Sequence, residues 1–243
     1  MVSLFFSLIL ACFIIFTARL QTLEGQIPPR YWISLGGGIS LAYVFTTFLA
    51  ELSKIQQALM PLEVPLVGYL LEHIHLLMLV GIVVVYSLEW LAQAEHPHLP
   101  MHPSIFGVHL GFFTLHSSLV GYLLQHTFTA WLSCLLLTVA LGIHLSITTH
   151  ELFEHHPDVF QQQGRWLLSG SLMLGWGLGQ WSVLPPEMLA ATIAFVAGVL
   201  IFQVLKHELP EEGGHFGAFL AGVTLNSCFL VMVSLLHTLE TSH

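Results

Sequence analysis

The sequence is poor in charge. Only 8% of its 243 residues are Asp, Glu, Lys or Arg, against roughly 25% in soluble domains, and 55% are apolar. A soluble fold of this length could not bury so much apolar surface, so we expect the solvent to be lipid. With five Lys plus Arg and a formal net charge of −9, the chain lacks the basic face that nucleic-acid binding requires, which excludes that class.

The sequence also lacks a disulfide framework and the common catalytic motifs. Cys12, Cys134 and Cys228 each stand in a long apolar run, where cysteine behaves as a small buried hydrophobe. There is no CxxC, HExxH, GxSxG or phosphate-loop pattern, so we expect neither an enzyme nor a prosthetic group. The first 17 residues lack the basic start and the small-residue cleavage site of a signal peptide, which predicts a retained helix.

What the sequence has in quantity is apolar runs separated by proline and glycine. A bilayer core of roughly 30 Å needs about 20 apolar residues per helix. Eight runs meet this need: 2–18, 32–53, 66–92, 104–125, 129–153, 165–184, 188–208 and 214–238. No proline or glycine marks the break between the fourth and fifth runs, but one helix over both would be about twice the required length. We predict an all-α fold, a polytopic bundle of eight transmembrane helices forming a single domain over residues 1–243, and we find no sequence repeat of solenoid length.

The few basic residues predict the orientation. If the N-terminus is outside, Lys54 falls outside, whereas the other four basic residues fall inside: Arg19, Arg30, Arg165 and Lys206. An excess of Lys and Arg on the inner side is typical of membrane proteins. Both termini then lie outside, and the loop 93–103, which contains three histidines, lies in the cytoplasm. The small size and short loops favour a bacterial inner (plasma) membrane.

Histidine is unusually abundant, with 16 in the chain. An ionisable side chain at membrane depth is costly and marks a functional site by default, and histidine is the commonest metal ligand. His116 and His150 stand in apolar runs on consecutive helices, which a short loop makes neighbours. A shared ion site is one interpretation, and a structural hydrogen bond between the helices is the other. On the second of these helices, His144 and Glu151 share one face, and Ser146 and His150 share another.

These features together resemble the ZIP (ZRT/IRT-like) family of divalent-metal transporters over nearly the whole chain. The eight helices, the outer termini and the cytoplasmic His-containing loop between helices three and four agree with that family. The segments 38–51 and 197–211 look like the family's second and seventh helices, and His150-Glu151 looks like the second half of its HExPHE motif. The resemblance implies a ZIP-like helical bundle with a metal site between helices four and five.

The implied metal site is only partly present. In the helix-four motif, HNxxD or HNxxE, His116 matches, but Ser117 and Val120 replace the amide and the acid. In the helix-five motif, Ser146 and Ile147 replace the first His-Glu pair, and the second pair is retained. With one further histidine nearby, the candidate metal ligands are His116, Ser117, His144, Ser146, His150 and Glu151.

The resemblance implies that the protein carries a divalent metal ion as substrate across the bilayer toward the cytoplasm. Zinc is expected first, with manganese, iron, cobalt and cadmium as further options, and the ion would pause at His116 and His150. The alternative is a non-transporting relative, a sensor or partner subunit, that has lost the binuclear site. A third hypothesis is a haem protein in which His109 and His116 face His144 and His150 as axial ligands. The coupling ion and the oligomeric state stay open, with a homodimer as one option.

Overall fold

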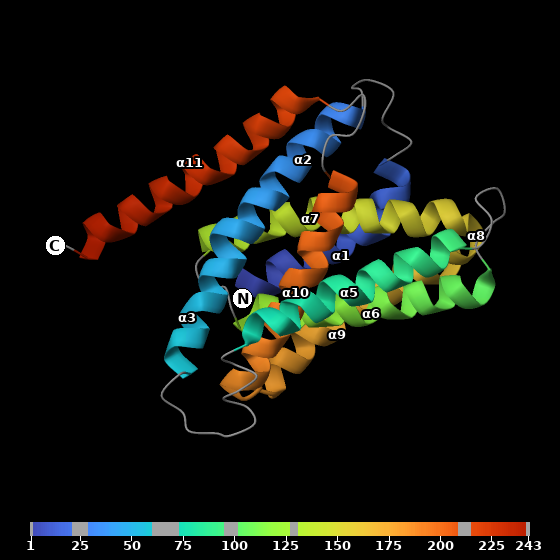
Figure 1. Ribbon diagram of the computed structural model, residues 1–243, viewed down its shortest axis with the longest axis horizontal. Coiled ribbons are helices and arrows are strands. Elements are labelled where there is room, and N and C mark those ends of the chain that lie inside the picture. Colours follow the sequence, from blue (N-terminus) through green and yellow to red (C-terminus); the bar gives the residue numbers. More distant parts are fainter. Residues whose placement is uncertain are drawn as a thin grey trace.

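The computed structural model describes residues 2–20, 29–59, 73–94, 102–126, 131–208 and 215–241, and all regular structure in these ranges is helical. Within these ranges the helical elements form eight continuous segments, and Figure 1 shows their arrangement. In order they are α1 (Val2–Leu20), α2 with α3 (Pro29–Tyr43 and Leu49–Leu59), α5 (Ile74–Ala94), α6 (Pro103–His126), α7 (Trp131–His155), α8 with α9 (Pro157–Val159 and Arg165–Trp181), α10 (Pro186–Gln203) and α11 (Phe216–Thr241). Three of them contain or end in a π-helical turn: η2 (Val44–Phe48), η3 (Phe160–Gly164) and η4 (Val204–Glu208).

The helices begin and end where the local chemistry requires. An apolar segment in lipid must satisfy its backbone hydrogen bonds internally, which a helix does. Proline lacks the N–H that the first turn of a helix leaves unused, and four helices begin with it: Pro29, Pro103, Pro157 and Pro186. The predicted break that no proline or glycine marks is also present, because α6 ends at His126 and α7 begins at Trp131.

The eight helices follow the predicted runs in order, which confirms the all-helical fold within the described ranges. Two helices are longer than predicted, since α3 continues to Leu59 and α8 begins at Pro157. The predicted third run begins at residue 66, but residues 66–72 lie outside the described part. Among the described residues, four stretches are long and apolar enough to cross a membrane: Ser34–Lys54, Ile74–Ala92, Pro103–His126 and Pro186–Lys206. That all eight helices cross, as one domain, stays a prediction.

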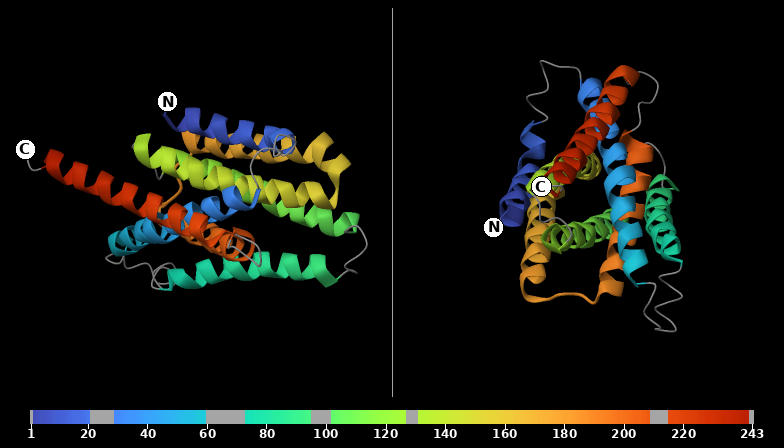
Figure 2. Two further views of the ribbon diagram at one scale, coloured as in Figure 1. Left: turned by 90° about the horizontal axis from the view of Figure 1, so that it is seen from above. Right: turned by 90° about the vertical axis from the view of Figure 1, so that its left-hand side faces the viewer.

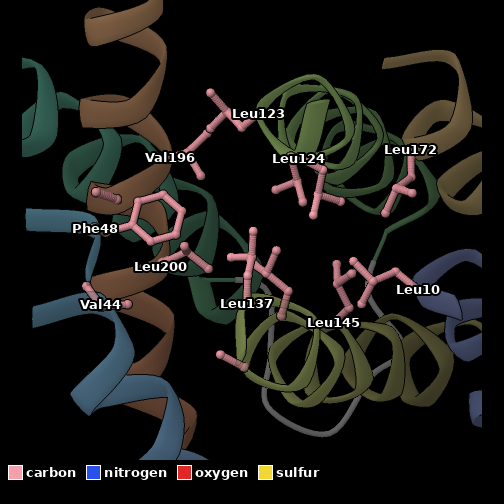
Figure 3. Packing of buried hydrophobic residues seen from close by; sticks show 14 of the residues in the cluster. Leu10, Val44, Phe48, Leu123, Leu124, Leu137, Leu145, Leu172, Val196 and Leu200 are labelled. Carbon is pink, nitrogen blue, oxygen red and sulfur yellow. The ribbon is translucent and has the colours of Figure 1, made fainter. Parts of the chain in front are cut away.

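The helices pack in two groups of four. The first group consists of α1, α6, α7 and α9, and the second consists of α2 with α3, α5, α10 and α11 (Figure 2). The groups meet where α2 contacts α7 and where α6 contacts α5 and α10. Leucines fill the interior of the first group: Leu10, Leu124, Leu145 and Leu172. In the second group, apolar residues of η2 and α10 face one another (Figure 3): Val44, Phe48, Val196 and Leu200.

Glycines allow three pairs of parallel helices to approach closely. A Cβ atom added to any of these glycines would meet backbone atoms of the partner helix. The three pairs are Gly38 of α2 with Gly222 of α11, Gly81 of α5 with Gly198 of α10, and Gly121 of α6 with Gly175 of α9. Small residues that bring backbones together are the usual means by which helices associate in lipid, where the hydrophobic effect does not drive them together.

Two of these pairs repeat one arrangement. Gly38 of α2 and Gly198 of α10 are each followed, six residues later, by the start of a π-helical turn. Each helix also packs along a parallel partner, α11 for α2 and α5 for α10. In the second pair, Lys206 of η4 forms an ion pair with Glu89 of α5. The two pairs therefore share a packing geometry, although the sequence shows no repeat of solenoid length.

Candidate functional site

His116 lies in the interior of α6 with its side chain 1% exposed. Neither ring nitrogen has a hydrogen-bond partner among the described residues. The ring lies parallel to that of Phe112, and it meets the ring of His144 on α7 edge to face, with 5.9 Å between centroids and an interplanar angle of 84°. A buried polar group without a partner costs about 1–3 kcal/mol. The His116 imidazole therefore has unused capacity for a ligand.

His144 faces the boundary between the two helix groups. Residues four apart on a helix share a face, so Ala140, His144 and Thr148 lie along one side of α7. One turn before His144, the Ser40 hydroxyl of α2 donates to the Ala140 carbonyl at 3.4 Å. One turn after it, Thr148 Oγ1 lies 3.5 Å from Gln203 Oε1 of α10. The histidine pair is thus flanked on both sides by hydrogen bonds that join the two groups.

The other predicted ligands do not all gather around this pair. Ser117 is buried beside His116 on α6, and Ser146 donates its hydroxyl proton to the Gly142 carbonyl of its own helix at 2.7 Å. His150 is exposed, and it follows His144 by six residues, which is about 240° around an α-helix. The side chain of Glu151 lies outside the described part of the chain. The structure therefore brings His144, and not His150, to His116.

Other histidines have local contacts. His109 is buried, with its Nδ1 3.1 Å from the Ile105 carbonyl one turn earlier. His102 belongs to the predicted cytoplasmic loop and accepts a hydrogen bond from the Ser104 N–H at the start of α6, at 3.3 Å. These contacts are typical of helix stabilisation. The remaining histidines of the loop 93–103 lie outside the described residues.

Two polar residues near the site were not among the predicted ligands. Thr148 and Gln203 are 3% and 2% exposed, and each stands in a long apolar helix. Their polarity within apolar runs, and the four-residue spacing of Thr148 from His144, are signals that the sequence does contain. The pairing of Gln203 with Thr148 has no such signal, because it joins positions 55 residues apart.

Metal-binding capacity can be judged from the donor set. Within the described ranges, no group of three or more His, Cys, Asp and Glu residues could hold a metal ion. Two imidazoles are good donors for borderline transition metals, but a zinc ion takes about four ligands. The histidine pair thus suits a weakly held ion that keeps part of its water shell or takes donors of another residue type.

Comparisons with known proteins add no relative. No protein-family model, curated protein or solved structure matches this chain. The resemblance to the ZIP family therefore rests on residues of the chain itself, in particular His116 and the pair His150-Glu151. The histidine pair and its surroundings are the features from which a function can be argued.

Proposed function

We propose that this protein is a ZIP-like membrane transporter that carries a divalent transition metal ion, zinc first, toward the cytoplasm. The observation that supports this proposal most is the buried pair of His116 and His144 at the boundary between the two helix groups. Ionisable residues inside membrane proteins usually mark pathways for ions. An imidazole pair favours zinc, cobalt, nickel or copper over magnesium and calcium, which prefer oxygen ligands.

The position of the pair suits transport better than permanent storage. Four-coordinate zinc sites with all ligands supplied by the protein hold the ion for structure, whereas a transported ion must leave. Two imidazoles provide about half of such a set, and α7 contacts the second helix group one turn before His144 and one turn after it. Each positive charge that moves inward gains about 2.3 kcal/mol per 100 mV of membrane potential. A weak site on a downhill path is therefore sufficient for uptake.

Uptake into proteoliposomes tests this proposal. Purified protein would be reconstituted and screened with zinc, manganese, iron, cobalt and cadmium. We expect saturable uptake by the wild type, uptake at the level of empty liposomes for the His116→Ala, His144→Ala double variant, and near-normal uptake for the control His150→Ala. Retained uptake in a folded double variant would show that the ion does not pass the histidine pair. Loss of uptake in His150→Ala alone would instead support the pairing of His116 with His150 that the sequence predicts.

A second candidate function is a non-transporting protein of the same architecture, a sensor or a partner subunit. It is favoured by the small number of classical ligands, since the described residues contain no cluster of three. This function predicts metal binding by the purified protein without uptake by any proteoliposome preparation. Equilibrium dialysis with zinc, run beside the uptake assay, separates the two functions.

A further inference from the structure

Gln203 is the buried polar residue for which the proposed function has no role. It is the last residue of α10 before the π-helical turn η4, and its side chain is 2% exposed. A primary amide buried in apolar surroundings costs free energy unless its oxygen and nitrogen are both used. Gln203 reaches across the boundary between the helix groups, to Thr148, instead of bonding within its own helix.

The hydroxyl of Thr148 has a single proton to donate. Its Oγ1 lies 3.1 Å from the His144 carbonyl and 3.5 Å from Gln203 Oε1, so the proton goes to the nearer carbonyl. The oxygen and nitrogen of a glutamine amide have nearly the same shape and can exchange places by rotation about the last bond. After that rotation the Gln203 amide N–H donates to Thr148 Oγ1, and the amide oxygen becomes free to act as a ligand.

The contact with Thr148 places the Gln203 amide one helical turn along α7 from His144. His144 and Thr148 are one turn apart on the same face of α7, which places their Cβ atoms about 6 Å from each other. Gln203 contacts Thr148 from the second helix group, and His116 contacts His144 from the first. Gln203 and His116 therefore contact residues of α7 that lie one helical turn apart, and both ring nitrogens of His116 are without a partner among the described residues.

We propose that Gln203 supplies the third protein ligand of a metal site begun by His116 and His144, through its amide oxygen. This inference rests on the proposed function and names the donor set of its site. The set has two nitrogens and one oxygen, and none of the three donors is charged. It suits borderline divalent ions such as zinc and cobalt, which accept imidazole and oxygen together, and it discriminates against magnesium and calcium. A bound ion would join the two helix groups.

Cobalt(II) is a suitable probe because its visible absorption reports the number and type of its ligands. We expect a cobalt titration of the purified full-length protein in detergent to give saturable bands. Gln203→Leu should weaken cobalt binding at least about tenfold and change the bands. Gln203→Glu should strengthen binding, because it replaces a neutral oxygen with a charged one. The matched control is Ser40→Ala, which removes a different hydrogen bond between the helix groups and should change neither the affinity for cobalt nor the bands.

The outcomes separate this inference from the proposed function. If Gln203→Leu binds cobalt with the affinity and spectrum of the wild type, while His116→Ala loses binding, then Gln203 is not a ligand and the histidine pair stands alone. If the wild type gives no bands, the metal site and the proposed transport both fail. Should Gln203→Leu not fold, Gln203→Glu decides, because a purely structural glutamine predicts no gain in affinity.

Discussion

Which histidine faces His116 depends on rotation around a single helix. His144 and His150 both lie on α7, six residues apart, so they cannot share a face. The sequence offered both as ligands, and the ZIP motif favoured His150. In the structure His144 is 2% exposed and lies against His116, whereas His150 is exposed. Individual side-chain burial, and not helix assignment, distinguishes the two.

Tyr122 illustrates a buried polar side chain with a structural role. Its hydroxyl donates to the Ser182 carbonyl at 3.1 Å and accepts the Leu184 N–H at 2.8 Å, which secures the turn between α9 and α10. Tyr122→Phe removes both hydrogen bonds and should lower the free energy of unfolding by about 1–3 kcal/mol. Tyr86→Phe is the control, because Tyr86 is exposed and makes no hydrogen bond among the described residues. Thermal unfolding in detergent would compare them, and equal midpoints would contradict the role of the hydroxyl.

Close approach of backbones decides how the helices pair. The crossing of α6 and α9 places Gly121 against the Leu172 carbonyl and Gly175 against the Ser118 carbonyl. A methyl group at either glycine would force the two helices apart. Elsewhere on α6, a Cβ atom at Gly111 would meet no atom of the described residues within 4 Å. The same helix therefore contains one glycine that packing requires and one that it does not.

This difference gives a matched test on a single helix. Gly121→Ala should destabilise the protein, because overpacking a close contact costs about 1–3 kcal/mol. Gly111→Ala should be neutral or stabilise slightly, because alanine is the better helix former by about 1 kcal/mol. The measurement is the unfolding midpoint of both purified variants. Equal destabilisation would mean that the crossing tolerates separation and that loss of glycine itself causes the effect.

Two π-helical turns, η2 and η4, occupy equivalent positions in the second helix group. Each begins six residues after the glycine at which its helix, α2 or α10, crosses its partner. A π turn inserts one residue and rotates everything that follows, and such turns are frequent at functional sites. In α10 the turn begins directly after Gln203 and contains Lys206, which pairs with Glu89 of α5. The turn therefore adjoins both the candidate ligand and an ion pair that joins α10 to its partner helix.

The number of membrane crossings is a property of the whole molecule, and it can be tested at one loop. If all eight helices cross, three crossings separate the N-terminus from residues 95–101, and the two lie on opposite sides. If only the four stretches that meet the length and hydropathy requirements cross, two crossings separate them, and they lie on the same side. The C-terminus lies on the side of the N-terminus in both cases, so the loop decides.

We expect the loop to be cytoplasmic and both termini to be outside. Epitope tags at the N-terminus, within residues 95–101 and at the C-terminus would be exposed to an impermeant protease in intact cells. Cleavage of the terminal tags alone supports eight crossings and the orientation predicted from the basic residues. Cleavage of all three tags supports four crossings. Cleavage of the loop tag alone supports eight crossings with the opposite orientation, in which both termini are inside.

The sequence by itself determined that the described residues are helical, approximately where their helices lie and which polar residues stand within apolar runs. These are local properties, because a segment in lipid must satisfy its own backbone and about 20 apolar residues are needed to cross. Only the tertiary structure decided that the helices form two groups, that His144 rather than His150 meets His116, and that Gln203 meets Thr148. Those pairings depend on steric fit between helices that are distant in the chain. A helix in lipid is apolar nearly all the way round, so its pattern of apolar residues does not indicate which faces meet.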